Sequence, residues 1–292
     1  MPAKANLTKA ANITANVREI DFVSSFAQSW KNLQQIWGIM RPIKKDPGSI
    51  LKAYTASVTL QSGSVGEGEE IPYSLASVVE AAKTDLSLLK YAKAVSIEAV
   101  NKYGAEIAVE RTDKAFLDQL QSKVMNDFYT FLATGTLTAT KSTFQAAFAH
   151  AVGAVKNKWD AMDREAGGVT AFCNIMDAYA YLGAASLSVQ TAFGIDYVKN
   201  FMGADTVILT SKVASGKVIA TPTSNIVAYY IDPGDSQFAE LGLNYTVDGE
   251  LPLIGFSTQG NYQTAVGECF ALMGFVLWAE YLDGIAVVTV NP

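Results

Sequence analysis

The residue types that usually carry enzyme chemistry are few in this sequence, and their spacing matches no catalytic or metal-binding motif. The only histidine, His150, lies in the apolar stretch FQAAFAHAVGAV. It has no cysteine or acidic partner at the spacing of a metal ligand, so we interpret it as a packed or half-exposed helix residue. The sequence has no nucleophile elbow, no P-loop and no dinucleotide-binding glycine motif.

Two groups of carboxylates are the remaining candidates for acid–base or metal chemistry. The first, in the segment DAMDRE, consists of Asp160, Asp163 and Glu165. Its basic neighbours favour a solvated helix end. The second, in DPGDSQFAE, consists of Asp232, Asp235 and Glu240. It lacks the ligand order of an EF-hand, and its Pro-Gly pair predicts a turn. We therefore expect no enzyme, no cofactor and no metal site.

The charge and the composition limit the classes of function. The 292 residues carry a net charge of −6, yet residues 1–50 hold seven bases and three acids. The acidic remainder argues against a nucleic-acid reader. A basic arm on an acidic body can dock on a neighbouring copy, touch a polyanion or be a solvated tail. Only 17% of residues are charged, against about 25% in an ordinary domain. This low share indicates either a surface hidden by other copies or a large monomeric core.

The cysteines and the apolar runs indicate a cytoplasmic protein. Cys173 and Cys269 lie far apart in apolar surroundings, which predicts buried free thiols in a reducing compartment. The beginning of the sequence has no apolar segment of the signal-peptide type. The longest apolar run, 269–279, is shorter than the ~20 residues that span a bilayer. We expect a soluble chain without membrane contact.

The first half of the chain predicts an arm, a hairpin and two helices. Aromatic residues at helical spacing predict a helix over 21–37, and the prolines that follow predict extended backbone. An arm with so many aromatic residues needs a surface on which to bury them. Alternation over 54–60 and 71–79 predicts a hairpin with a glycine-rich, acidic tip, and 86–97 a further strand. Apolar stripes predict helices over 105–132 and from about 142 to 166.

The second half predicts short strands and helices. The strands are expected at 169–175, 206–209, 218–220 and 226–231, and the helices at 176–184 and 194–201. The end of the chain, 268–281 and 285–290 around an Asp-Gly turn, predicts an apolar hairpin.

This order of elements resembles the major capsid proteins of tailed bacteriophages, which have the Hong Kong 97-type fold. The segments that carry the resemblance are SLLKYAKAVSIEAV, which leads through Glu98 to the long helix, and FLDQLQSKVMNDFYTFLATGT, which resembles the "spine" helix. TVILTSKVASGKVIATPTSNIVAYY resembles the axial-domain strands, and YLDGIAVVTV the closing peripheral strand. The resemblance covers essentially the whole chain and implies the α+β class.

The resemblance also implies a division of the chain and a structural function. The implied parts are an N-terminal arm (1–49), an extended loop or E-loop (50–83), a peripheral domain (84–167 and 266–292) and an axial domain (168–265). The implied function is self-assembly as hexamers and pentamers into an icosahedral virion shell around double-stranded DNA, held by non-specific contact. The implied partners are a portal and either a separate scaffolding protein or, if the chain is a mature one, none, with assembly in the host bacterial cytoplasm. No lysine lies between residues 53 and 82, so the covalent lysine cross-link of some members is not expected.

The acidic tip of the hairpin is the candidate contact between copies. We predict that its acids face a basic segment of another copy and that reversing their charge impairs assembly without unfolding the subunit. The acids are Glu67, Glu69 and Glu70, and the bases are Arg41, Lys44 and Lys45. Two alternatives remain open: an encapsulin-like nanocompartment, which shares the fold, and a cytosolic α/β enzyme with an unrecognised site.

Overall fold

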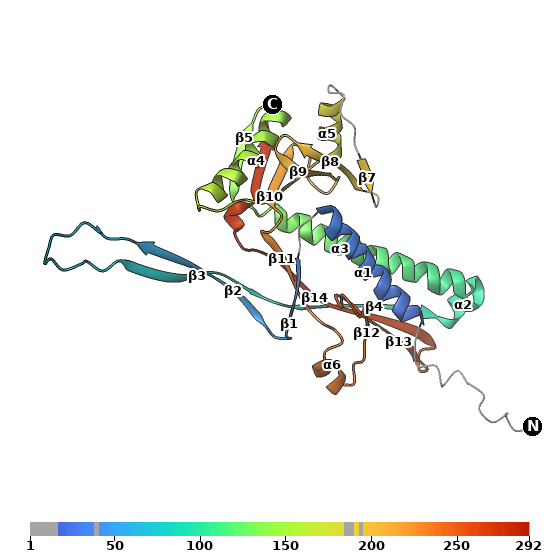
Figure 1. Cartoon of the computed structure of the whole chain (residues 1–292). Coiled ribbons are helices and arrows are strands. Elements are labelled where there is room, and N and C mark those ends of the chain that lie inside the picture. Colours follow the sequence, from blue (N-terminus) through green and yellow to red (C-terminus); the bar gives the residue numbers. More distant parts are fainter. Residues whose placement is uncertain (1–16, 38–40, 184–189, 193–194, 292) are drawn as a thin grey trace, which may run out of the picture.

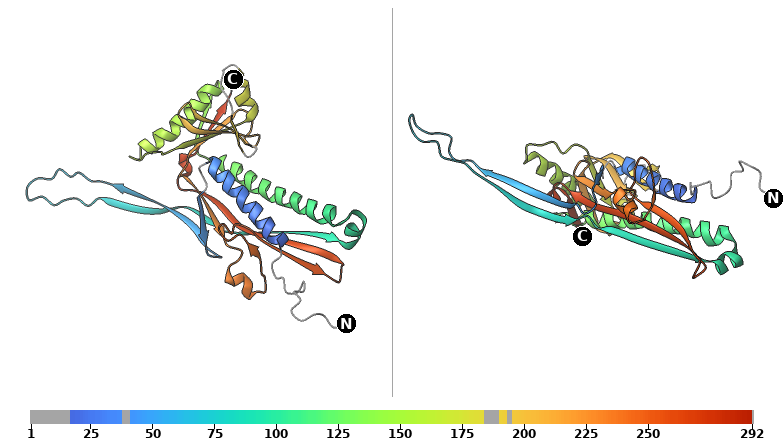
Figure 2. Two further views of the ribbon diagram at one scale, coloured as in Figure 1. Left: turned by 45° about the vertical axis from the view of Figure 1, so that its right-hand side comes forward. Right: turned by 90° about the horizontal axis from the view of Figure 1, so that it is seen from below.

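The computed structural model describes residues 17–37, 41–183, 190–192 and 195–291. Two mixed sheets form the body, one long helix runs beside the first sheet, and a two-stranded hairpin projects far from both (Figures 1 and 2). The chain is therefore an extended molecule with a limb, in the α+β class that the sequence predicts.

Helix α1 (Val17–Trp37) packs on the body of its own chain. Its apolar stripe is buried and consists of Phe22, Val23, Phe26, Ala27 and Trp30. Phe22 stacks on Phe256 of the first sheet, with 4.0 Å between the ring centroids. The helix predicted over 21–37 is thus confirmed, and the surface that buries the aromatic residues of its described part belongs to the same chain.

The hairpin consists of β2 (Ile50–Thr59) and β3 (Leu75–Asp85), which form a sheet of their own. A β-bulge at Ala53/Tyr54 shifts the register near its base. The predicted hairpin is confirmed. Its second strand was expected over 71–79, whereas β3 starts later, at Leu75, and ends later, at Asp85.

The spine of the molecule follows the hairpin. Strand β4 (Leu88–Ser96) leads into α2 (Ile97–Tyr103), whose first turn is capped by the Ser96 side chain. After Gly104, with φ 81°, a π-helical turn (Glu106–Glu110) opens into α3 (Arg111–Leu132). The long helix predicted over 105–132 is confirmed, and its first turn is π-helical.

The first sheet lies against the spine helix. Its order is β1 (Arg41–Lys45), β11 (Ile226–Ile231), β14 (Val266–Ala279), β13 (Gly255–Asn261) and β12 (Thr246–Val247), with β4 also paired to β14. The short helix α6 (Ser236–Glu240) lies in the connection from β11 to β12. The long apolar strand β14 is central, which explains why its sequence lacks polar alternation.

The second sheet forms a separate layer with α4 (Phe144–Asp160) packed on it. Its order is β5 (Leu137–Lys141), β15 (Ala286–Val290), β10 (Lys217–Pro222), β6 (Val169–Cys173), β9 (Ala204–Leu209), β8 (Ile195–Phe201) and β7 (Gln190–Ala192). Helix α5 (Ile175–Leu182) follows β6, and a 3-10 turn (Leu282–Gly284) precedes β15.

Three expectations about local structure are wrong. The segment predicted as a helix over 194–201 is strand β8 from Ile195 on, because it pairs with β9. The two terminal strands do not form a hairpin: β14 pairs with β4, β11 and β13, whereas β15 pairs with β5 and β10. Helix α4 ends at Asp160, not near 166, because Asp163 adopts a positive φ of 54° in the turn that follows.

The sheets join strands from both sides of the predicted domain boundaries. Strand β15, from the predicted peripheral part, lies in the second sheet and pairs with β10 from the predicted axial part. Strands β11 and β13, from the predicted axial part, lie in the first sheet. The boundaries at 167/168 and 265/266 stay a prediction that rests on resemblance.

Candidate assembly surfaces

The hairpin is the most exposed part of the described chain, although much of it is apolar. Its exposed large apolar side chains, with exposed fractions of 51–92%, are Ile50, Tyr54, Val58, Leu60, Ile71, Tyr73, Leu75, Val78 and Val79. An isolated two-stranded hairpin is marginal in water, and an exposed apolar patch of this kind marks an interaction surface. This exposed apolar surface makes the hairpin a candidate contact surface.

The register gives the hairpin two different faces. Val58 is opposite Ala76, and Tyr54 is opposite Glu80, so Tyr54, Val58, Ala76 and Val78 share one side, which we call the apolar face. Near the base of the hairpin, this side ends at an ion pair in which Lys52 Nζ lies 3.0 Å from Glu80 Oε2.

The opposite side carries hydroxyl groups. Ser57 is opposite Ser77, with their hydroxyl oxygens 2.8 Å apart, and Thr59 is opposite Leu75. Leu75 and Val79 also point to this side, so it is mixed rather than wholly polar. The two faces therefore differ in polarity, and the apolar face gains more from leaving water.

The tip of the hairpin carries the three predicted contact acids, Glu67, Glu69 and Glu70, all exposed. The backbone N–H of Gly66 donates to Glu69 Oε2 at 2.9 Å, and Gly68 turns the chain with φ 84°. The tip lies far from β1 in every view (Figures 1 and 2).

The predicted basic partners lie together on strand β1, but two of them have contacts in their own chain. Lys44 Nζ donates to Asp232 Oδ2 at 2.7 Å, and this hydrogen bond raises the pKa of the ammonium. Lys45 Nζ lies 5.3 Å from the centroid of the Tyr229 ring. Arg41 is exposed. The structure brings the three bases to one strand and does not bring them to the acidic tip.

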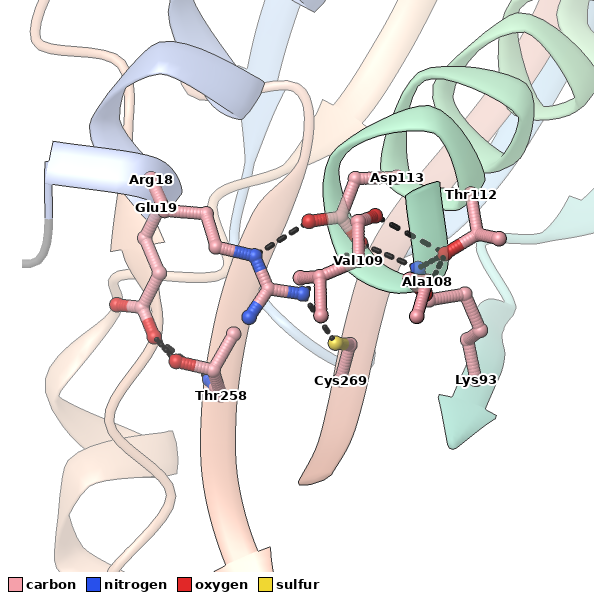
Figure 3. A network of polar contacts seen from close by, with 9 residues as sticks. All are labelled: Arg18, Glu19, Lys93, Ala108, Val109, Thr112, Asp113, Thr258 and Cys269. Atoms are coloured by element: carbon pink, nitrogen blue, oxygen red, sulfur yellow. Dashed lines mark hydrogen bonds and ion pairs between the residues drawn. The ribbon is translucent and has the colours of Figure 1, made fainter. Parts of the chain in front are cut away.

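A polar network fixes the first turn of α1 to the spine (Figure 3). Arg18 donates through Nε and Nη2 to both carboxylate oxygens of Asp113 on α3, and through Nη2 to Cys269 Sγ at 2.9 Å. Lys93 of β4 also donates to Asp113. Burial raises the pKa of Asp113, but the hydrogen bonds from Arg18 and Lys93 outweigh this effect and lower it overall.

A second set of contacts joins α1 to the edge of the first sheet. The Glu19 carboxylate is buried and accepts from the Thr258 backbone N–H at 2.6 Å and from the Thr246 hydroxyl at 2.7 Å. Farther along α1, Lys31 forms an ion pair with Glu250, which lies between β12 and β13. Sequence reasoning missed the contacts of α1, since its partners lie 95 to 251 positions away along the chain. One signal in the sequence could have indicated these contacts: the charged pair Arg18 and Glu19 stands just before the apolar stripe of α1.

The residues first considered for chemistry lie on exposed helix positions, at helix ends or in turns and loops. His150 is exposed on α4. Asp232 accepts from the Gly234 N–H and pairs with Lys44, and Asp235 caps α6, as expected for a turn. Asp160 ends α4, and Asp163 lies in the following turn, so the two do not share a helix face.

Both cysteines are buried free thiols, as predicted. Burial raises the pKa of Cys173 to about 12. Within the described residues, no three histidine, cysteine or acidic side chains gather as a metal site would require. In the same residues, no helix has the length and apolarity to cross a membrane.

No family model matches the sequence, and no curated protein matches it either. Solved structures do match over nearly the whole chain. The capsid of an empty GTA particle has a TM-score of 0.58 at 9% identity, covering 100% of this chain and 95% of that one. Mycobacterium phage Che8 has a TM-score of 0.55 at 12% identity, covering 82% and 84%.

An encapsulin also matches. The SrpI encapsulin complex from Synechococcus elongatus has a TM-score of 0.52 at 12% identity, covering 98% of this chain and 93% of that one. These likenesses confirm the predicted Hong Kong 97-type capsid fold. At such low identity they establish the fold alone.

Proposed function

We propose that this chain is the major capsid protein of a tailed bacteriophage. In this role it assembles as hexamers and pentamers into an icosahedral shell that encloses double-stranded DNA. The proposal is supported by the fold, which the capsid subunits of the similar structures share.

The observation that carries the proposal is the projecting hairpin. Its apolar side chains are exposed on a limb that its own body does not cover. Obligate interfaces between copies are large and hydrophobic. We propose that the apolar face lies on a neighbouring copy and that the hydroxyl face stays toward water.

The tip and strand β1 supply a proposed polar contact between copies. In this contact the acids Glu67, Glu69 and Glu70 of one copy approach Arg41 of the next, with Lys44 and Lys45 beside it. Because Lys44 already forms an ion pair with Asp232, Arg41 is the base most available for an ion pair with the acids of another copy. Exposed ion pairs of this kind contribute about 0–1 kcal/mol each. Their effect on assembly would come from their recurrence in every copy of the shell.

The further assignments follow from the same proposal. The parts of the chain would be the arm (1–49), the E-loop (50–83), the peripheral domain (84–167 and 266–292) and the axial domain (168–265). Assembly would take place in the host bacterial cytoplasm with a separate scaffolding protein and a portal. The packaged DNA would be held by non-specific contact, and the mature location would be the virion.

An encapsulin-like shell is the second candidate, because an encapsulin is among the similar structures. Both functions predict a closed shell and differ in its contents. The deciding experiment is expression of the chain in bacteria, with and without the scaffolding gene of its own genome, followed by electron microscopy of the purified particles. Shells with nucleic acid support the capsid, and shells with a protein cargo support the nanocompartment. Uniform monomers or dimers under both conditions would refute both.

A further inference from the structure

We propose that the cavity between the C-terminal part of α3 and the connection from β9 to β10 is a binding site for a phosphate group, which Lys212 and Lys217 hold. The shape and the charge of the cavity carry this inference, and the ligand class follows from them alone. In the proposed shell the phosphate would come from the backbone of the enclosed DNA, and only this last step rests on the proposed function.

The cavity lies where the spine helix meets the second sheet (Figure 1). Its volume is about 360 Å³, toward the lower end of the range for pockets that hold a small ligand. The C-terminal part of α3 forms one wall, and the β9–β10 connection with the start of β10 forms the other. The buried part of the lining is largely apolar and consists of Tyr129, Val213 and Ile219. A ligand in this cavity would contact both layers of the molecule.

The charged side chains that line the cavity are both cations. Lys212 is exposed and Lys217 is half-buried. Neither ammonium group forms an ion pair or a hydrogen bond with another described residue. Among the described residues, no acidic side chain lines the cavity. Two acids on neighbouring helices already have partners: Asp127 is in an ion pair within α3, and Asp177 accepts from the Gly216 N–H at 2.6 Å.

The connection that carries the lysines is held in place by its own chain. The side-chain amide of Asn174 donates to the Val213 carbonyl at 2.8 Å. The Ser215 hydroxyl donates to the Asp177 carboxylate at 2.7 Å. Because these contacts fix the connection before a ligand arrives, binding needs little further ordering of the backbone. The two ammonium groups, one near each end of the connection, therefore share one preorganised cavity.

The polar groups beside the cations suit a phosphate. An ammonium group is a compact charge with several N–H donors, and a phosphate accepts charge-assisted hydrogen bonds through its oxygens. Asn126 and Thr130 on α3 add an amide and a hydroxyl group, which can donate to the remaining oxygens. A metal ion would be repelled by the two cations, and an apolar ligand would desolvate them without compensation. An anion with oxygen acceptors is therefore the matching ligand class.

Compensation of the helix dipole is the competing role for the two lysines. The cavity also contacts Ala133 at the C-terminal end of α3, where the dipole is equivalent to about half a negative charge. Two ammonium groups exceed this charge by about one and a half units, so compensation alone leaves the cavity positive. Lysines with only this role would stabilise the subunit and bind no ligand.

Pyrophosphate and a short DNA duplex are the probes, each added to unassembled subunits and compared with sodium chloride of equal ionic strength. A probe at about ten times its dissociation constant should raise the Tm by roughly 3 °C. Lys212→Gln combined with Lys217→Gln should abolish this rise, whereas Lys212→Arg combined with Lys217→Arg should keep it. The matched control is Lys90→Gln combined with Lys114→Gln, which changes two exposed lysines outside the cavity and should behave as wild type.

The two probes separate the sources of the phosphate. A rise with both probes that only the double Lys→Gln variant of the cavity loses supports the site and its occupation by DNA. A rise with pyrophosphate alone supports the phosphate site and refutes the DNA backbone as its occupant. No rise with pyrophosphate, or a rise that this variant keeps, overturns the site. None of these measurements requires a shell, so failure of the site and failure of the proposed function are distinguishable.

Discussion

Replacing Phe22 by alanine removes the ring that joins α1 to the first sheet. This side chain is 6% exposed and stacks on Phe256, with a further contact to Phe116 at a centroid distance of 6.0 Å. The structure assigns α1 to the core of its own subunit. If that assignment is right, Phe22→Ala destabilises the isolated subunit.

The magnitude follows from the burial of the ring. Truncating a buried phenylalanine costs about 3–5 kcal/mol through lost transfer energy and the cavity that remains. Alanine recovers about 0.5 kcal/mol of helix propensity. A net loss of about 3–4 kcal/mol corresponds to a fall in Tm on the order of 10 °C for a chain of this size.

The assay is thermal and denaturant unfolding of unassembled subunits at low concentration. The matched control is Ile20→Ala on the same helix, where the side chain is 43% exposed and the expected change is within about 0.5 kcal/mol. Equal stability of Phe22→Ala and wild type, combined with impaired assembly, would show that α1 packs on another copy. That result would refute the reasoning.

Three further changes test the polar network and the hairpin. Asp113→Asn leaves two cations facing a neutral amide at a position where the native carboxylate is buried and Arg18 is partly exposed, and it should cost about 1–3 kcal/mol at neutral pH. Because the pKa of Asp113 is lowered in the folded chain, its contribution is fully present above the unfolded pKa of ~3.9 and is lost as pH falls through the folded pKa. The variant should therefore lose less stability than wild type in this acidic range, and parallel pH–stability curves would contradict this. Val78→Asp on the apolar face should abolish shells, whereas Val79→Asp, which is equally exposed on the hydroxyl face, should be tolerated; equal effects would refute the assignment of faces. Charge reversal to lysine at the tip should impair assembly and leave subunit unfolding unchanged, and normal shells from this variant would exclude the tip contact. The reversed acids are Glu67, Glu69 and Glu70.

Sequence periodicity determined the local elements of this protein. The apolar stripe over 105–132 predicted the spine helix because positions three and four apart share one helix face whatever surrounds them. Alternation and glycines likewise located the hairpin, and the order of these elements was sufficient to indicate the fold. The acids at 232 and 235 were recognised as turn residues for the same reason, since a turn is made by neighbouring residues.

Only the tertiary structure decided which strands pair and what each surface touches. The segment over 195–201 is a strand because it pairs with β9. Strand β15 does not pair with β14 because it pairs with β10 and β5 in the other sheet. The partner of Arg18 was likewise invisible in the sequence until the fold placed its guanidinium on Asp113 of the spine helix. Sheet pairing and surface contacts join residues far apart in the chain, so their energies depend on partners that no local pattern contains.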